Sequence, residues 1–115
     1  ASTYADSLAA GKVVAAPVST VLADGMACRV AESDALDILR PHVDHVVQVD
    51  DAEVAEAMRA IFADTHNVAE GAGAAGFAAA LQERAQNRGQ VVGTVLSGGN
   101  VDSAMFARVL SGATA

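Results

Sequence analysis

Residues 91–96 read Val-Val-Gly-Thr-Val-Leu, a continuous apolar run with several β-branched side chains. A run of this kind is typical of a buried strand in a parallel sheet. The pair Gly98-Gly99 interrupts it, and residues 102–110 follow as a helix with Phe106 and Leu110 on its apolar face. The order of strand, glycine turn and helix predicts an α/β protein.

The remaining sequence alternates in the same way. Residues 7–10 are expected to end a helix that Gly11 stops in the left-handed conformation. A second helix is expected at residues 33–39 with Ser33 as N-cap, and a third at 52–64, capped by Asp50 and with Arg59 facing water. A further helix is expected within the Ala-rich stretch 71–84. A short strand is predicted at residues 46–49, and residues 13–18 are extended. Because these few strands cannot complete a parallel sheet, the chain either associates with another chain or is a segment of a larger domain.

Composition narrows the class of protein. Of the 115 residues, 52% are hydrophobic but only 3% are aromatic, so Ala, Val and Leu must fill the core. The formal net charge of -7 argues against binding to nucleic acid or to an anionic membrane surface. No apolar run is long enough to span a bilayer. The single cysteine, Cys28, fits a reducing compartment and is expected to be buried, so we expect a cytoplasmic protein.

The turn Ser97-Gly98-Gly99-Asn100 is the best candidate for a ligand site. It follows a predicted strand, and ligands of open α/β sheets bind at the carboxyl ends of strands. Two glycines permit close backbone approach, and the next helix offers free N–H groups. From these residues alone we expect a phosphate or another anion; the alternative is an ordinary tight loop between a strand and a helix.

A second candidate region is the glycine-rich stretch Gly71–Gly76, which Glu70 precedes. It fits G-x-G-x-x-G literally, but a dinucleotide site requires a strand immediately before the glycines, and the sequence predicts none there. The alternative is that small residues allow close packing of backbones. Glu70 is either a site residue or a capping carboxylate. His42, His45 and His66 lack metal spacing, and we expect no metal site.

Three stretches, in this order, resemble one known family. They are Thr20-Val21-Leu22-Ala23-Asp24-Gly25-Met26-Ala27, Val68-Ala69-Glu70-Gly71-Ala72-Gly73-Ala74-Ala75, and Val95-Leu96-Ser97-Gly98-Gly99-Asn100-Val101-Asp102. They are similar to the A-D-G-x-A, V-x-E-x-x-G-A-A and L-S-G-G-N-x-D stretches of the pyridoxal-phosphate-dependent serine/threonine dehydratases, a family that includes threonine ammonia-lyases and serine racemases. The resemblance covers nearly the whole chain, from Ser7 to Leu110.

The resemblance implies the tryptophan-synthase-β-like fold, or fold type II. Residues 1–115 would then be a C-terminal segment of the catalytic domain, with a partial parallel sheet flanked by helices and no regulatory domain after it. It also implies a cofactor-binding set that comprises Gly25, Glu70, Ser97, Gly98, Gly99 and Asn100. In this set Ser97 would bond the pyridine nitrogen, Gly25 would lie against the cofactor, and Glu70 would lie near the ring.

The resemblance implies a lyase that converts serine or threonine to a 2-oxo acid and ammonia, commonly as a homo-oligomer. The family's Schiff-base lysine lies in an S-F-K-x-R motif that this chain lacks, and its sole lysine, Lys12, matches no such motif. We therefore expect no catalytic residue in this chain, an inactive isolated chain, and the remainder of the catalytic domain as its partner. The alternative function is a stand-alone, non-catalytic module that binds a partner or a small anion at the Ser97 turn.

Overall fold

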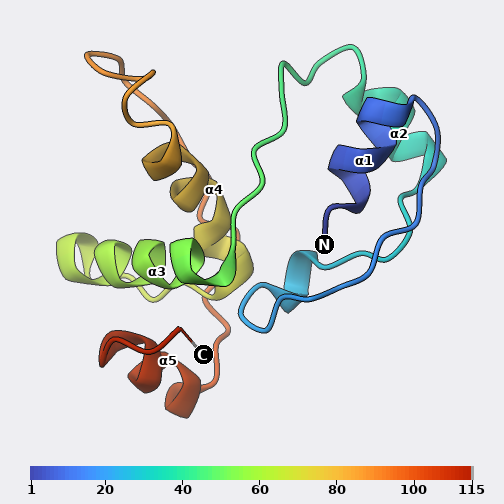
Figure 1. Ribbon diagram of the computed structural model, residues 1–115. Helices are drawn as coiled ribbons and strands as arrows, with labels where there is room; N and C mark the ends of the chain where they lie inside the picture. Colours follow the sequence, from blue (N-terminus) through green and yellow to red (C-terminus); the bar gives the residue numbers. More distant parts are fainter. Residues whose placement is uncertain (115) are drawn as a thin grey trace. The chain divides into compact units, whose positions relative to one another are not determined.

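The computed structural model describes residues 1–114, which form five α-helices and one short 3-10 helix (Figure 1). The chain divides into two compact units, one made of Ala1–Thr20 and Met26–Gln48, the other of Val21–Gly25 and the residues from Val49 onward. The elements are α1 (Thr3–Ala10), η1 (Asp24–Met26), α2 (Ser33–Leu39), α3 (Asp51–Thr65), α4 (Gly71–Gln82) and α5 (Ser103–Leu110).

The first unit packs α1 against α2. As expected, α1 ends at Gly11, whose φ of +68° is left-handed. Two buried polar residues of α1 form hydrogen bonds with other segments of the first unit. The Thr3 hydroxyl donates to the Cys28 carbonyl, and the Ser7 hydroxyl accepts from the Val14 amide at 2.9 Å. Because these hydroxyls are satisfied by backbone groups, they can be buried at little cost.

The predicted N-cap at Ser33 is wrong. The helix α2 already includes Ser33, and Glu32 precedes it as N-cap without a side-chain capping bond. The Ser33 hydroxyl bonds the Asp34 carboxylate at 3.4 Å instead. A capping side chain must lie just outside the helix to reach its free amides, and Ser33 lies one position too far along the chain.

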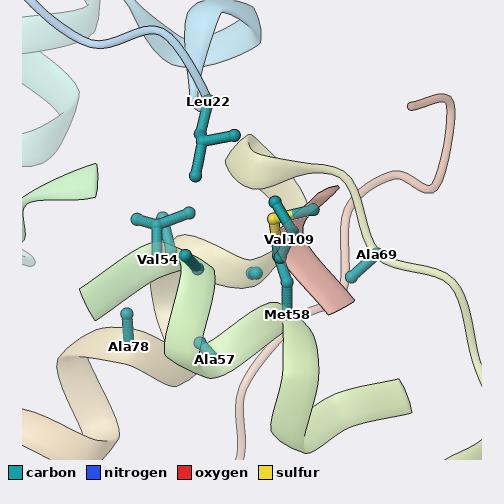
Figure 2. Packing of buried hydrophobic residues seen from close by; sticks show 10 residues of the cluster. Leu22, Val54, Ala57, Met58, Ala69, Ala78 and Val109 are labelled. Carbon is teal, nitrogen blue, oxygen red and sulfur yellow. The ribbon is translucent and has the colours of Figure 1, made fainter. Parts of the chain in front are cut away.

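The second unit is built on α3, which packs against both α4 and α5 (Figure 1). Asp50 caps α3 as predicted, since its carboxylate accepts from the Glu53 amide while the Glu53 carboxylate accepts from the Asp50 amide, each at 2.9 Å. In Figure 2 the Leu22 side chain extends from its loop toward Val54 of α3. The buried cluster comprises Leu22, Val54, Ala55, Ala57, Met58, Ala69, Ala74, Ala75, Ala78 and Val109.

Two details of this unit differ from the sequence-based expectation. In α5 the buried residue is Val109, whereas Leu110 is 38% exposed; Phe106 is partly buried and packs edge-on against Phe62. Arg59 does not simply face water, because its guanidinium donates to the Val109 carbonyl at 3.2 Å. A guanidinium on a long stem reaches the end of a neighbouring helix, which periodicity alone cannot show.

The predicted strands are absent from residues 1–114. Residues 46–49 and 91–96 belong to no helix or strand, and no backbone hydrogen bond joins 91–96 to another described segment. Val91 is fully exposed and Val95 is 80% exposed, so the expectation of a buried strand is wrong here. A strand exists only in a ladder with a neighbour, and the described residues contain no extended neighbour paired with this segment.

Two other features concern single residues and helix length. Cys28 is exposed, so the prediction that it is buried is wrong. None of the helices within residues 1–114 combines the length and the apolar composition needed to cross a membrane.

Candidate functional site

The turn Ser97–Asn100 is held against the residues that lead into α4. The Glu70 amide donates to the Gly98 carbonyl at 3.1 Å. A Cβ on Gly98 would run into the Glu70 carboxylate, and a Cβ on Gly99 would lie 2.6 Å from the Val68 carbonyl oxygen. Gly99 is therefore required by the close approach of two backbone segments, as the sequence suggested, whereas Gly98 leaves room for the Glu70 carboxylate.

Close backbone contacts also restrict which residues can occupy the first turn of α4. A Cβ on Gly73 would meet the Gly98 carbonyl oxygen, and one on Gly71 would meet the carbonyl of Leu22. Gly76, by contrast, has only ordinary contacts 3.9 Å away. The glycine-rich stretch thus serves close backbone packing, which was the alternative to a dinucleotide site, and no strand precedes it among the described residues.

A third segment, the loop Val21–Gly25, reaches the same place. The Val21 amide donates to the Asp51 carboxylate at 2.7 Å, and Leu22 is only 4% exposed. A Cβ on Gly25 would lie 3.3 Å from the Ala72 Cβ and 3.8 Å from a Glu70 carboxylate oxygen. Gly25 therefore lies beside the first turn of α4.

Glu70 is the common neighbour of these segments. It is half-buried and precedes α4 as its N-cap, but its side chain makes no capping hydrogen bond. The reading of Glu70 as a capping carboxylate is therefore wrong. Its Oε1 faces the positions where side chains of Gly25 and Gly98 would begin, so one carboxylate joins residues from all three sequence motifs.

Ser97 and Asn100 flank the two glycines and are both exposed. The Ser97 hydroxyl has no hydrogen-bond partner within residues 1–114, so it is available to a ligand. At the N-terminus of α5, the Asp102 carboxylate accepts from the Met105 amide at 2.9 Å. This negative charge already occupies the helix N-terminus, which disfavours the phosphate or other anion expected there from the turn geometry.

Sequence reasoning missed Asp51 and the separate roles of Gly71 and Gly73. The pattern before α3 identified Asp50 as the cap, but the contact from Asp51 to Val21 spans 30 positions and leaves no local signal. The spacing Gly71-x-Gly73 was noticed, although only the fold identifies the two backbones that these glycines contact. The three histidines are exposed, and no group of metal-ligating side chains forms among residues 1–114.

Comparison with known proteins gives one consistent family. The family model described as "Pyridoxal-phosphate dependent enzyme" matches residues 1–98. An L-threonine ammonia-lyase of Geobacter sulfurreducens is 42% identical over 96 residues, which cover 84% of this chain and 24% of that protein. A serine racemase of Arabidopsis thaliana is 35% identical over 103 residues, or 85% of this chain and 31% of that protein.

The solved structures agree with the sequences. The crystal structure of a threonine deaminase from T.th. matches with a TM-score of 0.81 at 34% identity, covering 89% of this chain and 36% of that one. Its fold is that of the fold type II enzymes, which confirms the fold expected from the resemblance, whereas the parallel sheet is not formed among the described residues. The chain spans about a quarter to a third of the curated relatives it matches.

Proposed function

This chain belongs to the family of pyridoxal-phosphate dependent enzymes, and we propose that it forms the pyridine-side wall of the cofactor site in a hydroxy-amino-acid lyase. The reaction is the conversion of serine or threonine to a 2-oxo acid and ammonia. In this proposal residues 1–115 are a C-terminal segment of the catalytic domain, in a cytoplasmic homo-oligomer.

The observation that carries the proposal is the meeting of Gly25, Glu70 and Gly98 around one carboxylate oxygen. Next to Gly98, the Ser97 hydroxyl is exposed and makes no hydrogen bond within residues 1–114. Positions without side chains beside a free donor suit the edge of a flat aromatic ring that carries a nitrogen acceptor. The residues present thus fit the pyridine edge of the cofactor.

Ser97 also favours a particular chemistry. Bound pyridoxal phosphate supplies an electron sink for the charge left when the α-proton is removed. A neutral hydroxyl donates to the ring nitrogen and leaves it unprotonated, whereas a carboxylate partner would keep it protonated. The weaker sink favours prompt loss of the β-hydroxyl over a long-lived negative charge on the substrate Cα.

The other residues of the site have supporting roles in this proposal. Gly98 and Gly99 bring Ser97 onto the segment before α4, where the amide of Glu70 holds the Gly98 carbonyl. Asn100 follows them in the turn, and Gly25 forms the opposite edge. The lysine and the phosphate-binding residues lie outside this chain.

The experiment uses the protein expressed from its complete reading frame. We expect Ser97→Ala to lower kcat/KM for threonine or serine about tenfold, the value of one hydrogen bond to the ring. Ser103→Ala, an exposed serine in the first turn of α5, is the control and should match the wild type. Formation of 2-oxo acid measures the reaction.

A second variant tests the chemistry of the ring nitrogen. In deuterium oxide, Ser97→Asp should raise α-proton exchange relative to 2-oxo acid formation, because a carboxylate strengthens the sink. Wild-type turnover in Ser97→Ala, with an unchanged exchange ratio in Ser97→Asp, would exclude this role for Ser97.

A further inference from the structure

The loop Val21–Gly25 belongs to a different compact unit from the residues on either side of it. Residues up to Thr20 and from Met26 onward are part of the first unit, whereas these five residues pack with the second. The loop that carries Gly25 therefore packs with the unit that contains α3 and α4, and the contacts that bind it there help to set the position of Gly25 beside Glu70.

Two kinds of contact bind the loop. Leu22 enters the buried cluster, where its side chain extends toward Val54 (Figure 2). One residue earlier, the Val21 amide donates to the Asp51 carboxylate at 2.7 Å, while the Val21 side chain is 58% exposed and adds little packing. Burial of an apolar side chain does not orient the backbone, whereas the hydrogen bond from Val21 to Asp51 is directional.

The capping of α3 does not require Asp51. Asp50 accepts from the Glu53 amide and Glu53 accepts from the Asp50 amide, so the capping box is complete with these two residues. As the first residue of α3, Asp51 presents its carboxylate to the loop amide from a rigid element. A hydrogen bond to an ionised acceptor is stronger than one between neutral groups.

We propose that Asp51 is a positioning residue for the cofactor site: through Val21 it holds Gly25 against Ala72 and Glu70. The inference rests on the proposed function, because it assigns the purpose of the Gly25 contact. In this proposal Asp51 acts through the loop backbone, by way of the Val21 amide.

The test compares Asp51→Ala with Asp50→Ala in the protein expressed from its complete reading frame. Both remove a carboxylate from the start of α3, but only Asp51→Ala releases Val21. We expect Asp51→Ala to weaken pyridoxal phosphate binding about tenfold, measured by absorbance titration, with Asp50→Ala near the wild type. Asp51→Asn should recover most of the affinity, because the amide oxygen still accepts.

Hydrogen exchange supplies a readout that does not depend on activity. In the absence of cofactor, the Val21 amide should exchange faster in Asp51→Ala than in Asp50→Ala or Asp51→Asn. If the wild-type protein binds the cofactor and Asp51→Ala binds equally well, or if Val21 exchange is unchanged, this inference is overturned while the proposed function stands. If the wild-type protein does not bind pyridoxal phosphate, the proposed function is overturned and this inference with it.

Discussion

At the scale of single residues, the site depends on positions that must lack a side chain. Gly71, Gly73, Gly98 and Gly99 each lie where a Cβ would run into backbone or into the Glu70 carboxylate. At Gly71 the contact is with the backbone of the Val21–Gly25 loop. In this chain the Leu22 carbonyl occupies the place of the Cβ, so a side chain there would require the Val21–Gly25 loop to shift.

Two glycines of α4 should respond to alanine in opposite ways. Gly73→Ala forces a Cβ against the Gly98 carbonyl, and we expect a loss of about 1–3 kcal/mol in the free energy of unfolding. Gly76→Ala lies in the same helix, is exposed and meets nothing closer than 3.9 Å, so it should stabilise the protein by about 0.5–1 kcal/mol. Urea unfolding of the protein expressed from its complete reading frame measures both changes; a stabilising Gly73→Ala would contradict the close approach.

At the scale of elements, the helix α3 organises the second unit. It begins with a complete capping box and contributes Val54 and Met58 to the buried cluster. It also reaches α5, where the Arg59 guanidinium donates to the carbonyls of Val109 at 3.2 Å and Ala113 at 3.4 Å. A cation at the carboxyl end of a helix opposes the negative end of its dipole, so Arg59 both bonds and neutralises the end of α5.

Replacing Arg59 should loosen α5. Arg59→Met keeps the aliphatic stem but removes the donors, and because the group is only half-buried we expect a loss of about 1 kcal/mol. The matched control is Arg88→Met, an exposed arginine without a hydrogen bond among the described residues, which should change stability by less than about 0.5 kcal/mol. Hydrogen exchange of the α5 amides would localise the effect. Equal changes in the two variants would argue against a stabilising role for the hydrogen bonds from Arg59 to the end of α5.

At the scale of the whole molecule, the described residues form two compact units in which several large apolar side chains are exposed. Val91 and Val95 are 103% and 80% exposed, and Ile38 in the first unit is 67% exposed. In a complete parallel sheet, an apolar run such as residues 91–96 would be covered by its neighbours. The exposed side chains agree with a segment that matches 24% to 36% of the length of its relatives.

The isolated chain should be inactive. Purified as 115 residues and verified by mass, it should not turn over threonine or serine with added pyridoxal phosphate, because Lys12 is its sole lysine and matches no catalytic motif. Light scattering and circular dichroism of the same sample test its state: we expect aggregation or a non-cooperative transition. Turnover would refute the proposed inactivity, and a cooperative folded monomer would support a stand-alone module.

The sequence by itself predicted most of the helices and named the candidate residues of the site. Local chemistry sufficed for these: the Asp50–Glu53 box starts α3, Gly11 stops α1, and three short motifs named Gly25, Glu70 and Ser97. It also predicted strands from apolar runs, which failed within residues 1–114 because a strand needs a paired neighbour that local sequence cannot supply. Only the tertiary structure decided that Gly25, Glu70 and Gly98 meet, and that Asp51 holds Val21 from 30 positions away. Contacts between distant segments depend on how the core packs, and the periodicity of apolar residues along the sequence does not predict them.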